Sequence, residues 1–166
     1  MALLAALVTL LPAAVLLSAG CGSLNEAEKR YSAALELQGQ ELWSEALVEY
    51  DAAIKLAPQN PEAFYNRGVV REALGQPDGA LSDYSEAIRL RPDHASAYGK
   101  RGAIYGQTGE LEKAVQDLDE AVRLDPKNAS AHLLRGRVYG GLGQHQRAIE
   151  DFTEAIRLDP QDTAAY

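Results

Sequence analysis

The chain has 166 residues, and its 24 acidic side chains outnumber its 16 basic ones, which gives a formal net charge of −8. This acidity argues against nucleic acid as a partner, because phosphate backbones favour basic surfaces. The single cysteine excludes an internal disulfide and any zinc site built on cysteines. The length suits one domain that buries a core of its own.

The N-terminal segment 1–20 differs in composition from the rest, because it contains no charged side chain. It is long and apolar enough for a membrane segment or for the core of a signal peptide. The only cysteine, Cys21, follows this segment directly. The order Leu17-Ser18-Ala19-Gly20-Cys21 resembles the end of a bacterial lipoprotein signal peptide. The resemblance implies that Cys21 is lipidated and becomes the N-terminus after cleavage.

A lipoprotein signal implies a domain that is held at a bacterial envelope membrane and faces the periplasm. The outer membrane is favoured over the inner one, because the residue after the cysteine is Gly22 and not the aspartate that retains lipoproteins at the inner membrane. Residues 21–26 then form a short linker. Two alternatives stay open: a cleaved secretory signal, which gives a secreted or periplasmic protein in which Cys21 has no role, and an uncleaved membrane anchor.

From residue 27 onward the sequence repeats with a fixed step of 34 residues, for example from Ala46 to Ala80. Small and turn-forming residues return at this step, for example Ala46, Ala80, Ala114 and Ala148, and Pro58, Pro92, Pro126 and Pro160. The step divides residues 27–162 into four units, 27–60, 61–94, 95–128 and 129–162. Residues 163–166 match the opening of a further, incomplete unit.

Each unit has the pattern of two helices joined by a turn. In residues 61–94, apolar side chains recur with helical spacing over residues 62–74 and again after Asp78, which is expected to cap the second helix. Gly75-Gln76-Pro77 separates the two helices. In the first unit Gly39-Gln40 matches Gly75-Gln76 with a displacement of two residues, which predicts that Glu41-Leu42 is an insertion in the turn.

A helix-turn-helix unit of this length with these columns resembles the tetratricopeptide repeat. The resemblance implies an all-α fold, an α-solenoid of stacked hairpins that forms a right-handed superhelix. First helices line a concave groove in this family, and second helices cover the convex side. It also implies a scaffold that binds a protein or peptide in the groove, and not an enzyme.

The candidates for ligand binding lie on the first helices, where side chains project toward the groove. They combine an aromatic anchor with charged and amide groups, a mixture that suits a peptide. Their pattern does not recur at the repeat step, so they can carry specificity while the repeating residues maintain the stack. These groove candidates are Tyr65, Asn66, Glu72, Lys100, Gln107 and Arg137.

Two columns of opposite charge also recur, an arginine on the first helix and an aspartate on the second. Asp83 has two candidate partners, Arg67 of its own unit and Arg101 of the next unit. Regular charge columns of this kind are expected to support the scaffold and not one ligand.

The sequence offers no pattern of catalytic residues and no cofactor motif. The three histidines are scattered, with no second ligand four residues away, so no metal site is expected. Two alternative functions stay open. The protein could be a self-associating structural protein that stacks into a homo-oligomer through an uncapped C-terminal end, or the repeat region of a longer protein whose effector domain lies elsewhere.

Overall fold

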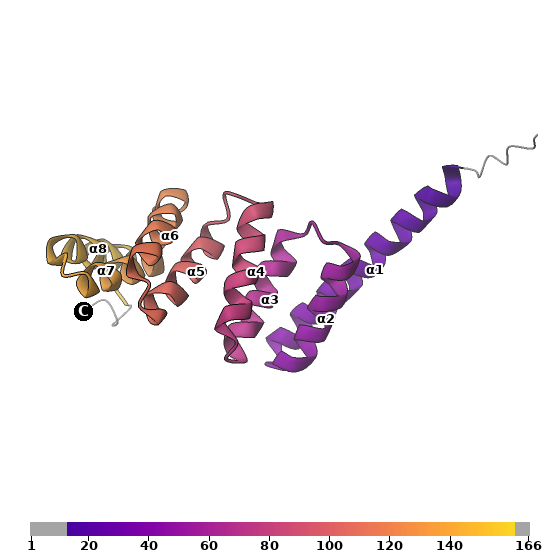
Figure 1. Ribbon diagram of the computed structural model, residues 1–166, viewed down its shortest axis with the longest axis horizontal. Coiled ribbons are helices and arrows are strands. Elements are labelled where there is room, and N and C mark those ends of the chain that lie inside the picture. Colours follow the sequence, from indigo (N-terminus) through magenta and orange to yellow (C-terminus); the bar gives the residue numbers. More distant parts are fainter. Residues whose placement is uncertain (1–12, 162–166) are drawn as a thin grey trace, which may run out of the picture.

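The protein is a row of antiparallel helix pairs (Figure 1), described by a computed structural model over residues 13–161, with side chains from residue 25 onward. These residues form eight α-helices and no strand. The helices are α1 (Ala13–Gly39), α2 (Trp43–Leu56), α3 (Pro61–Ala73), α4 (Pro77–Leu90), α5 (Ala95–Thr108), α6 (Leu111–Leu124), α7 (Ala129–Gly141) and α8 (His145–Leu158). The predicted all-α solenoid is confirmed.

The hairpins stack in chain order, so that each contacts its neighbours along the row. Contacts are most extensive within the pairs α1–α2, α3–α4, α5–α6 and α7–α8, and next between consecutive pairs. The first helices also approach one another, since α5 contacts α7. Helix α1 is the longest, with 27 residues, and its beginning extends past the stack in Figure 1. The expected partial unit at 163–166 lies outside the described residues.

Asparagine side chains cap two of the first helices. Asn60 Oδ1 accepts hydrogen bonds from the backbone N–H groups of Glu62 and Ala63, at 3.0 and 3.3 Å. Asn128 caps α7 in the same way. The expected cap at Asp78 is wrong, because α4 begins at Pro77 after Gln76 and has no side-chain cap. Asp78 lies in the first turn, where its negative charge interacts favourably with the positive end of the helix dipole.

The turns inside the hairpins share one left-handed residue. Glycine takes this place in three turns, at Gly75, Gly109 and Gly143, with φ values of 70°, 84° and 71°. In the first turn Glu41 occupies the same column with φ 59°. The backbone N–H of Leu42 bonds the carbonyl of Leu37, as Gln76 bonds Arg71 one unit later. The predicted insertion at Glu41-Leu42 is therefore wrong, and the first unit is in register.

Replacing Glu41 with glycine should stabilise the protein by about 0.5–1 kcal/mol. A residue with a Cβ loses roughly 1–2 kcal/mol in the left-handed region, and glycine avoids this loss at some entropic cost. Urea unfolding of the two proteins measures the difference. The matched control is Gly75→Ala, which places a Cβ in open space at the same turn position and should destabilise the protein. An equal unfolding midpoint for all three proteins would contradict the assignment of strain.

A small residue on each first helix allows the second helix of the hairpin to approach closely. A Cβ added to Gly68 would lie 2.7 Å from Tyr84 Cε1, and one added to Gly136 would lie 2.7 Å from Phe152 Cε1. In the first hairpin Ala34 takes this position and is fully buried. The core is thus a series of small clusters, one per hairpin, and each of the first three includes a buried residue of the next unit.

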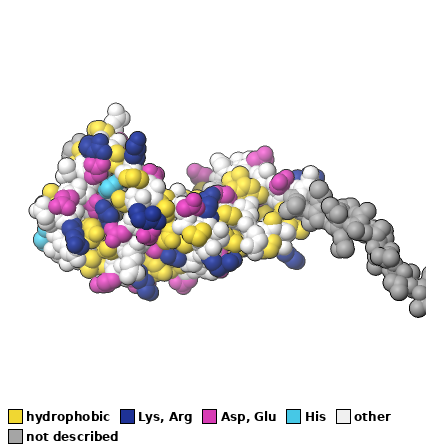
Figure 2. All heavy atoms as spheres, turned by 90° about the horizontal axis from the view of Figure 1, so that it is seen from above, with side chains coloured by type: hydrophobic (Ala, Val, Ile, Leu, Met, Phe, Trp, Pro, Cys, Tyr) yellow, Lys and Arg dark blue, Asp and Glu magenta, His cyan; other side chains and the backbone are white. Residues whose placement is uncertain are grey.

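The charge columns pair within the hairpin. Arg67 donates from Nε and Nη2 to the two carboxylate oxygens of Asp83, at 3.0 and 2.6 Å, and the buried Asp83 also accepts from Arg71. The same two-bond pair joins Arg101 to Asp117, and Arg135 joins Asp151 likewise. The alternative pairing of Asp83 with the arginine of the following unit does not occur. Figure 2 shows acidic and basic side chains interspersed over the surface.

Candidate functional site

Four of the six predicted groove residues line one cavity of about 370 Å³. Tyr65 and Glu72 reach it from α3, and Lys100 and Gln107 reach it from α5. Ser96 of α5 completes the wall with Ser130 and Leu134 of α7. The cavity therefore crosses three successive hairpins, as a groove for an extended chain must.

An ion pair joins two of the residues that line this central cavity. Lys100 Nζ lies 3.2 Å from Glu72 Oε2, and the buried Tyr84 hydroxyl donates a short hydrogen bond to the same oxygen. Burial raises the pKa of Tyr84, and its bond to Glu72 raises it further, so the phenol stays a neutral donor. Glu72 thus joins a buried hydroxyl on one side to a half-exposed cation on the other.

Aromatic contacts hold the Tyr65 ring in place. Its centroid lies 5.7 Å from that of Tyr84 and 4.8 Å from that of His94. Burial raises the pKa of Tyr65, whereas the nearby Lys100 lowers it. A ring fixed by two neighbours loses little entropy when a ligand contacts its free edge, which is a property of binding hot spots.

The sixth candidate, Arg137, lies on α7 at the rim of an adjoining cavity of about 320 Å³. Gln107, Ala103 and Leu134 line both cavities, so the two form one continuous groove. Arg137 is exposed and makes no ion pair or hydrogen bond within the part of the chain that the structure describes. Its charge is available to a ligand.

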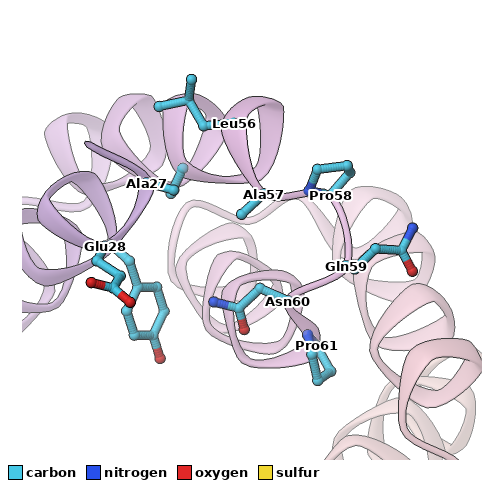
Figure 3. A pocket seen from close by; sticks show the side chains of 10 residues that line it. Ala27, Glu28, Leu56, Ala57, Pro58, Gln59, Asn60 and Pro61 are labelled. Atoms are coloured by element: carbon cyan, nitrogen blue, oxygen red, sulfur yellow. The ribbon is translucent and has the colours of Figure 1, made fainter. Parts of the chain in front are cut away.

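Asn66 lies apart from these five. Its amide donates to the Tyr31 hydroxyl at 2.8 Å, which ties α3 to α1. Tyr31 lines a third cavity, of about 550 Å³, at the N-terminal end of the array. In Figure 3 Ala27 and Glu28 project from α1 toward this cavity, and the linker that carries Pro58 and Asn60 faces them.

The cavity at Tyr31 contained no predicted binding residue. The signal for it was present in the sequence, because the linker after the first unit has smaller side chains than the next linker. Ala57 and Asn60 occupy the columns of Arg91 and His94. In the second unit Arg91 pairs with Glu62 at 2.5 Å, and His94 packs against Tyr65. The same space is open in the first unit.

The three histidines lie in separate places. His132 is buried between Asp151 and the carbonyl of Pro126, at 3.0 and 3.2 Å, which is a structural arrangement. His94 is buried beside Tyr65, and burial lowers its pKa. His145 is exposed at the start of α8. Over the described residues no three ligating side chains come together as a metal site requires.

The N-terminal predictions concern residues that the structure covers only in part. The segment 1–12 lies outside the described residues, and the backbone of Cys21 belongs to α1 without a described side chain. Among the helices that are described, none combines the length and the apolar character needed to cross a bilayer.

Family models identify the repeat. One described as "TPR repeat" matches residues 38–75 and 102–143, and one described as "Tetratricopeptide repeat" matches residues 61–94 and 129–162. Together these matches cover most of the chain. Among curated proteins no sequence matches significantly.

Solved structures share the fold over most of the chain. YrrB, described as a TPR protein with an unusual peptide-binding site, is 26% identical, with a TM-score of 0.74 over 84% of this chain and 72% of its own. Residues 41–end of MamA from Desulfovibrio magneticus RS-1 are 25% identical, with a TM-score of 0.78 over 84% and 79%. The first TPR of Spaghetti (RPAP3), bound to the HSP90 peptide SRMEEVD, is 25% identical, with a TM-score of 0.69 over 72% and 94%.

Proposed function

Because the chain belongs to the tetratricopeptide repeat family, whose members are generally interaction scaffolds and not enzymes, we propose that it holds a partner protein in its concave groove. The partner contributes a peptide or an extended segment that crosses α3, α5 and α7. One observation carries this assignment: Tyr65, Glu72, Lys100 and Gln107, from two successive hairpins, line one cavity. Two structural neighbours, one with a peptide-binding site and one bound to a peptide, support it.

The chemistry of the central cavity suits a polypeptide more than a small metabolite. The cavity is open and elongated across hairpins, and it offers an aromatic ring, an amide and one ion pair whose partners can exchange to ligand groups. Peptide-binding sites obtain affinity from a few anchored aromatic and charged residues surrounded by polar contacts.

The double variant Tyr65→Ala with Lys100→Ala should weaken partner binding at least tenfold, about 1.4 kcal/mol. Both side chains line the cavity, and neither belongs to the small-residue columns that hold the helices together. The partner is first isolated by crosslinking to the full chain in envelope preparations, and its affinity is then measured. The control is Glu86→Ala with Glu120→Ala on the second helices. If the control loses binding and the groove variant keeps it, the binding face is the convex one.

The proposed location is the periplasmic side of a bacterial envelope membrane, with a lipid on Cys21 and the outer membrane as the destination. The proposal is supported by the uncharged segment 1–20 and by the position of the only cysteine directly after it. In a Gram-negative host, wild-type protein should fractionate with the membrane and incorporate labelled palmitate. Cys21→Ser should do neither, whereas Ser23→Ala should behave as wild type. Soluble periplasmic protein from all three genes would exclude the anchor.

Self-association is a second candidate, favoured by one exposed side chain on α8. Leu47, Leu81 and Val115 of the earlier units pack into core clusters beside the following hairpin. Ile149 occupies the same column and is 58% exposed. Sedimentation of the full chain in detergent tests this candidate. A dimer that becomes monomeric with Ile149→Glu supports it, and a wild-type monomer excludes it.

A further inference from the structure

A polar pair closes the space between the helices in the first two hairpins. In the first, the Tyr50 hydroxyl of α2 donates to Gln38 Oε1 of α1 at 2.6 Å. In the second, the Tyr84 hydroxyl of α4 donates to Glu72 of α3. Both tyrosines are fully buried. Each ring and its polar partner therefore fill the space at the junction with the following unit.

The third hairpin lacks both members of this pair. The corresponding residues are Leu118 on α6 and Gly106 on α5. The aromatic ring is reduced to a leucine, and the long polar side chain is lost altogether. Beside these two residues lies a cavity of about 320 Å³ between α5, α6 and α7. Val138 takes part of the freed volume, because a Cβ added to Gly106 would lie 3.2 Å from Val138 Cγ2. Its apolar wall is formed by Leu111, Leu118, Leu134 and Val138.

The cavity is large enough for one apolar side chain of a ligand. An enclosed cavity of roughly 150 Å³ holds a benzene molecule. Leu118 and Val138 are buried parts of the core, so the floor is preformed and does not have to be assembled on binding. When an aliphatic side chain enters the cavity, its apolar surface moves from water into contact with the apolar wall. This transfer favours binding.

Arg137, at the rim of this cavity, favours a ligand with a negative charge. Arg137 is exposed there without an intramolecular partner among the described residues, and no carboxylate lines this cavity. Lys100, in the adjoining cavity, is already paired with Glu72. Arginine pairs with carboxylates through two parallel hydrogen bonds, which gives geometric selectivity as well as attraction.

We propose that this cavity is the specificity pocket of the groove, and that it takes a peptide with an aliphatic side chain next to an acidic one. The aliphatic side chain occupies the cavity beside Gly106 and Leu118, and the carboxylate binds Arg137. The inference rests on the proposed function, because it names the chemistry of the segment that the groove holds.

Two variants of the full chain separate the two parts of the proposal. Gly106→Gln with Leu118→Tyr restores the pair that the chain itself uses in its first hairpin and so fills the cavity. Gly102 leaves room for the new ring, as Gly68 does for Tyr84. Arg137→Glu keeps the cavity and reverses the charge at its rim. The matched control is Gln116→Ala, an exposed position on α6. Circular dichroism verifies that all variants keep the helicity of the wild type.

The probe is a library of random dodecapeptides displayed on phage, selected on each immobilised protein. On wild type, enriched sequences should share an aliphatic residue adjacent to Asp or Glu. The most enriched peptide, synthesised with a fluorophore, should bind the cavity-filled variant and Arg137→Glu at least tenfold more weakly, and Gln116→Ala equally well. Selection on Arg137→Glu should enrich Lys or Arg beside the aliphatic residue.

Two results would overturn the inference in different ways. If the enriched peptides bind both variants as wild type but lose affinity with Tyr65→Ala and Lys100→Ala, the groove binds peptides and this pocket does not select them. The proposed function then stands and the inference fails. If wild type enriches no sequence, the result counts against both.

Discussion

Replacing Asp83 with alanine should destabilise the protein by about 3–5 kcal/mol, the largest effect that we expect from one substitution. Asp83 is 1% exposed and receives hydrogen bonds from Arg67 and Arg71. Both guanidinium groups are mostly buried, with side chains 14% and 22% exposed. Removing the carboxylate therefore leaves two cations in a site of low polarity, and Asp51 compensates only the first of them.

Urea unfolding monitored by circular dichroism measures this loss, with two companion variants. Asp83→Asn keeps the shape and removes the charge, so it should fall between wild type and alanine. Glu120→Ala removes an ion pair with Arg123 that is exposed to solvent, and it should leave the midpoint unchanged. A midpoint for Asp83→Ala as high as that of Glu120→Ala would mean that the buried pair contributes nothing to the fold.

The second large effect is expected at Gly136, where alanine should cost about 1–3 kcal/mol. An added Cβ would lie 2.7 Å from Phe152 Cε1 and 3.3 Å from the backbone oxygen of Ala148. The backbone cannot yield without moving α8 away from α7. The loss opposes the gain in helix propensity, which is about 1 kcal/mol for glycine to alanine.

Gly140 provides a control on the same helix. A Cβ at Gly140 meets no atom within 4 Å, so Gly140→Ala should raise the melting temperature through propensity alone. Calorimetry of both variants gives the comparison. Opposite signs for the two substitutions are expected, and a gain in stability from both would show that the hairpin contact at Gly136 is loose.

The repeat made most of the fold predictable, because its constant step aligns the columns that bury each helix. Two local predictions were wrong for physical reasons. Glu41 takes a left-handed turn that propensity assigns to glycine, so the sequence alone suggested a shifted register. Asp78 was expected as a cap, but the chain enters α4 at Pro77, one residue earlier.

The candidate site was predictable in composition more than in arrangement. Helical periodicity predicts which side chains of the first helices face the groove. Five of the six candidates line the two joined cavities. Asn66 does not line them, because its amide donates a hydrogen bond to the Tyr31 hydroxyl. The ion-pair partner of each charged residue also depends on the distances between helices. Sequence periodicity does not predict these distances. Their roles in binding stay predictions.

The arginine columns also determine how firmly one hairpin is joined to the next. Arg67 reaches back to Asp51 of the preceding unit at 2.7 Å, and Arg135 reaches back to Asp119 at 2.8 Å. Arg101, at the central junction, meets the neutral hydroxyl of Ser85. At two junctions the arginine thus forms an ion pair with the preceding unit, and at the middle one it donates to a neutral hydroxyl, which is a weaker link.

The pair of Lys100 and Glu72 spans that same central junction from the groove side. In a linear array each junction contributes its own term to stiffness, so a change at one of them is not spread over the rest. A ligand carboxylate that takes Lys100 from Glu72 would release the groove-side link at the junction where the other link is weakest. We therefore expect a bound carboxylate to change the curvature of the array first at this junction between α3 and α5.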